Sequence, residues 1–181
     1  MSYNIETHIH LYSSWAASTA ARASKLNRFN VETGQKILEN SSIRKLILNP
    51  DKLPKDELDF DKKHNDWRNE IISFSTKFAK NKFTHGVAAK LINIYLKSII
   101  ICGGFHNHEN STFIHPPIDS ILLDELAQND FNENKMFWKS AQKVAWSNFD
   151  SNFYQLVINQ IRNGLKGAPL WTIEKYWKGH R

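Results

Sequence analysis

Two side chains have the clearest potential for chemistry, the carboxylate of Asp119 and the amine of Lys82. Asp119 follows Pro116 and Pro117, which fix the direction of the chain, and it precedes an apolar run typical of a helix. Free amides and the helix dipole keep such a carboxylate ionised, so it can stabilise positive charge that develops in a substrate. An aspartate in this position is also typical of a helix cap without a chemical role. Both interpretations of Asp119 remain open from the residues alone.

Lys82 can act as a nucleophile if a fraction of its amine is neutral near physiological pH. Lys77 and Lys80 lie close to it in the sequence, and neighbouring cations or burial lower the pKa of an amine. A solvated lysine, or one that contacts a phosphate, is the alternative interpretation.

The segment that contains both residues resembles the active site of the helix-hairpin-helix DNA glycosylases. Gly86-Val-Ala-Ala-Lys90 resembles the start of a hairpin helix in that superfamily, and His115-Pro-Pro-Ile-Asp119 resembles the motif that carries its catalytic aspartate. The archaeal 8-oxoguanine DNA glycosylases are the most similar branch, because their hairpin also lacks the usual Leu-Pro-Gly-Val-Gly. The resemblance implies that Asp119 acts at C1′ of a flipped-out nucleotide, where the transition state has oxocarbenium character. It also implies that Lys82 forms a Schiff base in a lyase, whereas water attacks in a monofunctional enzyme.

The same resemblance implies DNA contacts at the hairpin and a pocket for the flipped base. Phosphate binds at a helix N-terminus where a glycine allows close approach, and the predicted DNA-binding residues are Thr84, His85, Gly86 and Lys90. A flipped base needs aromatic stacking and hydrogen bonds to its edge, although aromatic residues at helical spacing are more often core. The predicted pocket residues are Trp15, Trp146, Trp171 and Trp177 for stacking, with Arg22, Gln35 and Glu174 as edge readers.

We expect no metal and no organic cofactor. Cys102 is the only cysteine, which excludes an intramolecular disulfide and a four-cysteine iron-sulfur cluster. His106, His108 and His115 follow it, but zinc sites usually have one short-spaced pair of ligands and a second pair further along the chain. A polar loop is the expected structure of this segment.

Helical patterns must position these residues, and no sustained period-two alternation indicates a strand. A first helix is expected over 13–23, where small side chains allow close packing, and a central buried helix over 91–100. An apolar stripe at helical spacing is formed by Trp67, Ile71, Phe74 and Phe78. We therefore expect one compact all-α domain over 1–181 with a central helix-hairpin-helix. Its parts are an N-terminal helical layer (1–50), the hairpin and aspartate region (60–127) and C-terminal helices (135–181).

Charge and hydropathy indicate the setting and the partner. Lys and Arg number 24 against 18 Asp and Glu, a net charge of +6 that favours polyanionic partners. The first residues show no basic region followed by an apolar run, so we expect no export signal. No apolar stretch is expected to reach the roughly 20 residues that cross a bilayer. We expect a cytoplasmic monomer that binds double-stranded DNA, with no membrane contact and no obligate protein partner.

The leading hypothesis is a DNA glycosylase that excises a damaged or modified base and leaves an abasic site. Genome repair and defence against modified phage DNA are both open as its role. The alternative is a basic helical module that binds nucleic acid without chemistry and uses Asp119 as a cap. A helical toxin-type RNase fits less well, because no Arg and His are paired at close helical spacing.

Overall fold

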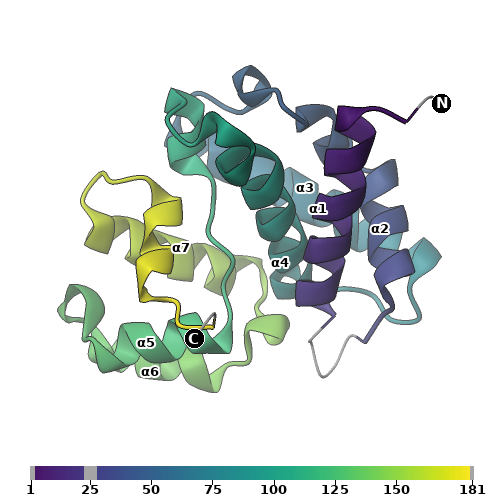
Figure 1. The fold of residues 1–181 in the computed structure, drawn as a ribbon. Coiled ribbons are helices and arrows are strands. Elements are labelled where there is room, and N and C mark those ends of the chain that lie inside the picture. The colour runs from purple at the N-terminus through teal and green to yellow at the C-terminus, as the bar shows by residue number, and fades with distance from the viewer. Residues whose placement is uncertain (1–2, 23–27, 180–181) are drawn as a thin grey trace.

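The chain is described by a computed structural model that covers residues 3–22 and 28–179 (Figure 1). Within these ranges it forms helices and no strands, which confirms the prediction of a compact all-α fold. The α-helices are α1 (Ile5–Ala21), α2 (Val31–Asn40), α3 (Glu57–Phe78), α4 (His85–Leu96), α5 (Ser120–Gln128), α6 (Lys135–Lys143) and α7 (Ser151–Leu165). The shorter helical segments that matter below are η1 (Ser42–Leu46), η2 (Pro50–Lys52), η3 (Lys97–Phe105), η4 (Glu109–Phe113), η6 (Trp146–Asn148) and η7 (Leu170–Tyr176).

The first helix starts earlier than the sequence predicted. The Asn4 side chain accepts a hydrogen bond from the Thr7 amide at 2.9 Å, so α1 begins at Ile5 rather than near residue 13. Position 23, the expected end of this helix, lies outside the described residues. The expected close packing is present: a Cβ on Gly34 of α2 would lie 2.3 Å from the Ser18 hydroxyl of α1.

The helices form two lobes, each with its own hydrophobic core. The N-terminal lobe contains α1 to α4, and its core includes Ile37, Trp67 and Leu91. The C-terminal lobe contains α5 to α7 with η7, and its core includes Leu122 and Trp138. In Figure 1 the C-terminal lobe lies to the left of α4. Because α4 contributes to both cores, its residues are the ones that can face the boundary between the lobes.

The central helix is longer and more apolar than expected. α4 continues into the π-helical segment η3, and His85–Phe105 has the length and composition of a membrane span, with a mean hydropathy of 1.5. The prediction that no stretch reaches this length was therefore wrong. Of its most apolar window, 67% is buried inside the protein, as in the core helix of a folded domain. The prediction of a buried central helix is confirmed.

Candidate active site

Asp119 lies at the boundary between the lobes and contacts three parts of the chain. Its Oδ1 accepts a hydrogen bond from the Leu122 amide at 2.9 Å and caps α5, which confirms the predicted helix start. Its Oδ2 accepts hydrogen bonds from Lys90 Nζ at 2.9 Å and from Trp177 Nε1 at 3.1 Å. In Figure 1 the C-terminal end accordingly lies close to α5. One carboxylate oxygen therefore caps α5, and the other accepts hydrogen bonds from an ammonium and an indole.

Lys90 is the buried partner of this carboxylate. Only 6% of its side chain is exposed, and its ammonium also donates to the Ile118 carbonyl at 3.3 Å. The ammonium lies 5.2 Å from the centre of the Trp146 ring. Burial lowers the pKa of Lys90, and the Asp119 carboxylate opposes that change. A lysine in this environment can become a neutral amine beside a proton acceptor.

A second ion pair, between Lys97 of η3 and Glu174 of η7, lies within electrostatic range of the first. Lys97 Nζ donates to Glu174 Oε2, and 18% of the glutamate side chain is exposed. Burial raises the pKa of Glu174, the Lys97 ammonium opposes this, and Lys90 and Asp119 also influence it. These four residues, Lys90, Lys97, Asp119 and Glu174, are called the charged cluster below.

Aromatic side chains close the space around the first pair. Trp146 lies over Lys90, and the Trp177 indole binds Asp119. The residues around the buried end of Lys90, which include Gly86, Trp146 and Tyr154, leave no space large enough for a water molecule. Trp146 and Trp177 therefore flank the pair, and 18% of the Asp119 side chain stays exposed.

Lys82, the predicted nucleophile, lies apart from this arrangement. It is exposed in the segment that joins α3 to α4. Among the described residues, no hydrogen bond or ion pair connects Lys82 to Asp119. Lys90, which the sequence assigned to phosphate binding, occupies the position next to the carboxylate instead. The geometry thus favours Lys90 over Lys82 as the reactive amine.

The predicted DNA-binding residues at the start of α4 contact the protein's own chain. The Thr84 hydroxyl donates to the Ser147 carbonyl at 2.6 Å and accepts from the Val87 amide at 3.2 Å. The Gly86 amide donates to the Phe149 carbonyl at 3.0 Å. A Cβ on Gly86 would lie 1.9 Å from the backbone oxygen of Trp146, so the glycine is needed for internal packing. His85 is half-buried, and its Nδ1 is buried without a hydrogen-bond partner.

The predicted base pocket is only partly assembled. Trp146, Glu174 and Trp177 come together around the charged cluster, whereas Trp171 has an edge contact with His106. The other three predicted residues lie on the N-terminal lobe: Trp15 on α1, 49% exposed, Arg22 at the C-terminus of α1 and Gln35 on α2. Within the described ranges, no hydrogen bond, ion pair or ring contact joins these three to the charged cluster.

His108 and His115, in the loop before Asp119, contact different aspartates. His108 contacts Asp51 at 3.1 Å, and His115 contacts Asp61 at 2.9 Å on α3. In the part of the chain that is described, no group of three or more His, Cys, Asp and Glu side chains is arranged to hold a metal ion.

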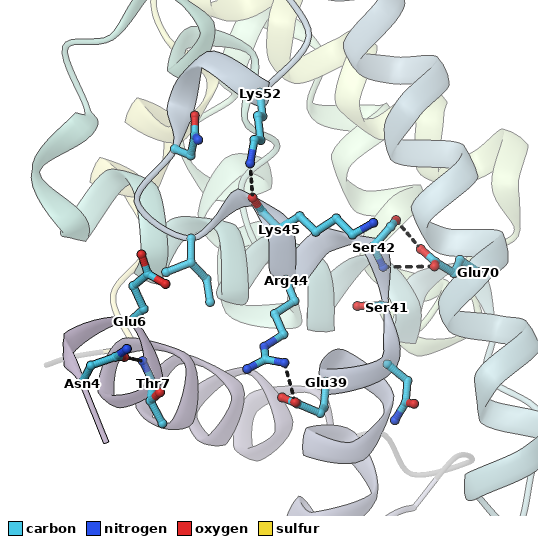
Figure 2. Close-up of a pocket in the computed structure, with 13 residues that line it drawn as sticks. Asn4, Glu6, Thr7, Glu39, Ser41, Ser42, Arg44, Lys45, Lys52 and Glu70 are labelled. Atoms are coloured by element: carbon cyan, nitrogen blue, oxygen red, sulfur yellow. Dashed lines mark hydrogen bonds and ion pairs between the residues drawn. The ribbon is translucent and has the colours of Figure 1, made fainter. Parts of the chain in front are cut away.

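A separate polar pocket of about 890 Å³ lies in the N-terminal lobe, between α1, α2 and η1. Figure 2 shows that two of its carboxylates already have partners: Glu39 binds Arg44, and Glu70 binds Ser42. None of the predicted site residues lines this pocket.

Sequence reasoning missed the role of Lys90 and the Lys97 ion pair. The available signal was a lysine within the otherwise apolar run Val87-Ala-Ala-Lys90-Leu-Ile, because a buried charge requires a partner. Searches of protein-family models, curated proteins and solved structures returned no significant match to this chain. The candidate site is therefore argued from its own geometry.

Proposed function

We propose that the protein is a DNA glycosylase in which Asp119 and Lys90 act together at C1′ of a flipped-out nucleotide. The observation that carries the proposal is the 2.9 Å contact between a buried amine and a carboxylate at the boundary of two lobes. The carboxylate at the start of α5 has the character needed to stabilise an oxocarbenium-like transition state. The buried amine beside it has the character of a nucleophile.

The reaction can be written with these two groups alone. Asp119 accepts a proton from the Lys90 ammonium, and the neutral amine attacks C1′ as the C1′–N bond breaks. The electron pair of that bond leaves with the base, which takes the proton from Asp119. The regenerated carboxylate stabilises the remaining positive charge. A second proton then passes from Nζ to the ring oxygen O4′, and the C1′–O4′ bond breaks to give a protonated Schiff base between Nζ and C1′. Water in place of the amine gives the monofunctional reaction.

Double-stranded DNA is the proposed partner. The net charge of +6 favours a polyanion, and Lys80 and Lys82 are exposed just before α4. Contacts from such lysines to phosphates would position the duplex without reading its sequence. Trp146 and Trp177 lie against the pair, so we propose that at least one of them moves when a base binds. We propose a damaged or modified base as the substrate, including bases of modified phage DNA.

One observation favours the alternative of a non-catalytic nucleic-acid-binding module. Asp119 caps α5, and its other oxygen is already bound by Lys90 and Trp177. A carboxylate with these contacts can be purely structural, with the basic surface serving to bind phosphates.

The test is incubation of the protein with damaged oligonucleotides and modified phage DNAs, scoring released base, abasic sites and covalent complexes trapped by borohydride. Asp119→Asn keeps the helix cap, because asparagine caps as well as aspartate. It should lower base release by at least about 100-fold while DNA binding persists. Lys90→Met should remove the trapped complex, and Lys82→Met should retain it.

Two results contradict the proposal. If wild-type protein binds DNA but releases no base from any substrate, the binding module is the better description. If trapping survives Lys90→Met and disappears in Lys82→Met, the reactive amine is Lys82.

A further inference from the structure

The segment before Asp119 is hydrogen-bonded to α4 through two backbone carbonyls that lie two residues apart. Pro116 O accepts a hydrogen bond from Asn93 Nδ2 at 2.8 Å, and Ile118 O accepts one from Lys90 Nζ at 3.3 Å. Carbonyls two residues apart in an extended chain can face the same neighbour. Lys90 and Asn93 are three residues apart and share one face of α4. α4 therefore aligns the segment over the three residues before Asp119.

Asn93 is itself fixed on every side. The residue is fully buried, and its Nδ2 also donates to the Tyr154 hydroxyl at 3.0 Å. Its Oδ1 lies 2.8 Å from His64 Nε2. Because an amide oxygen can only accept, His64 must donate from Nε2. Its other nitrogen, Nδ1, then accepts from Arg68 at 3.4 Å. His64 and Arg68 are four residues apart on α3, so the expectation that no Arg and His are paired at close helical spacing was wrong.

A series of hydrogen bonds leads from Asn93 through Tyr154 to His115, the residue at the start of the segment that carries Asp119. The Tyr154 hydroxyl accepts from Asn93, so its own proton is directed to His115 Nδ1 at 3.1 Å. His115 Nε2 then donates to Asp61 Oδ1 at 2.9 Å. His115 is the residue before Pro116, so this chain of bonds fixes the segment at its start as Asn93 does at its middle.

We propose that Asn93 is a positioning residue for the Lys90–Asp119 pair. Its two N–H donors hold the Pro116 carbonyl and the Tyr154 hydroxyl, and they thereby set the direction in which Asp119 enters the site. The effect on catalysis rests on the proposed function, whereas the effect on the position of Asp119 does not.

Asn93→Asp tests this role with little change of shape. An ionised aspartate keeps the acceptor for His64 but loses both donors, so the Pro116 carbonyl is released. A displacement of reacting groups by about 1 Å can lower a rate by about 100-fold. We expect kcat for base release to fall about 10- to 100-fold, with KM within about twofold of wild type.

The position of Asp119 can be read without any substrate. The Trp177 indole donates to Asp119 Oδ2 at 3.1 Å, so its proton–nitrogen NMR signal responds when the carboxylate moves. Trp177→Phe identifies this signal by removing it. We expect a displaced Trp177 indole signal in Asn93→Asp.

Asn110→Asp is the matched control. Asn110 is 2% exposed, and its Nδ2 also donates to two backbone carbonyls, those of Pro50 and Leu53, each at 3.4 Å. These carbonyls belong to the connection around η2 rather than to the segment before Asp119. The control should destabilise the protein, yet leave the Trp177 signal and kcat at their wild-type values.

The proposal is overturned if Asn93→Asp and Asn110→Asp give the same Trp177 signal and the same kcat. If the new carboxylate prevents folding, Asn93→Leu removes the donors without adding a charge, and it must displace the Trp177 signal for the proposal to stand. A displaced signal in a protein whose wild type releases no base upholds the positioning role and rejects the glycosylase.

Discussion

The contact between Lys90 and Asp119 predicts a measurable coupling free energy in a double-mutant cycle. Lys90→Met keeps the length of the side chain and removes its charge. Asp119→Asn keeps the cap of α5 and removes the opposite charge. The cycle compares the free energies of unfolding of these variants, of the double variant and of the wild type.

The burial of the two side chains sets the expected magnitude. Breaking a fully buried ion pair from one side costs about 3–5 kcal/mol, because the remaining charge is uncompensated. Asp119 is 18% exposed and keeps two other donors, so Lys90→Met should cost about 2 kcal/mol. Asp119→Asn leaves an ammonium that is 6% exposed, and this amine can limit the loss by releasing its proton. The double variant has neither charge, so the coupling should be about 1–3 kcal/mol.

Urea unfolding at pH 7, followed by circular dichroism, measures all four free energies. The double variant should be more stable than the sum of the single losses predicts. The exposed pair Lys36–Glu32 provides a control cycle, because its side chains are 58% and 69% exposed and their coupling should stay below about 0.5 kcal/mol. If the losses in unfolding free energy of the two single variants add to that of the double variant within about 0.5 kcal/mol, the predicted coupling between Lys90 and Asp119 is refuted.

Two further predictions concern packing and pH. Gly86→Ala should destabilise the protein by about 1–3 kcal/mol in thermal melts, because the new Cβ would lie 1.9 Å from the Trp146 carbonyl oxygen. Gly103→Ala, whose nearest neighbours would lie 3.8 Å away, should melt close to wild type, and equal melting of the two variants would contradict this packing. Burial holds the pKa of His64 and of His115 below the ordinary 6.5, so the unfolded chain binds more protons as pH falls below that value. Stability should be complete above about pH 6.5 and decline by up to about 1.4 kcal/mol per pH unit for each histidine below it, and equal urea midpoints at pH 7 and pH 5 would reject this linkage.

Local features of the fold could be predicted from the order of the residues. The start of α5 at Asp119, the burial of Trp67 and Ile71, and the buried central helix could all be predicted. Each depends on residues within a few positions of one another, where helical periodicity, proline and capping side chains act directly. Phe78, predicted on the same stripe as Trp67 and Ile71 at the end of α3, is 39% exposed. The early start of α1 was equally local, because the Asn4 cap sets it, but its signal was overlooked.

Which side chains meet at the candidate site depends on how the helices pack. Lys82 and Lys90 both precede Asp119 in the sequence, and the packing of α4 between two lobes turned Lys90 toward the carboxylate. The same packing brought Trp146 over Lys90 and Glu174 to Lys97. Such contacts join residues far apart in the chain, and their geometry depends on how both cores fill their volume rather than on local preference.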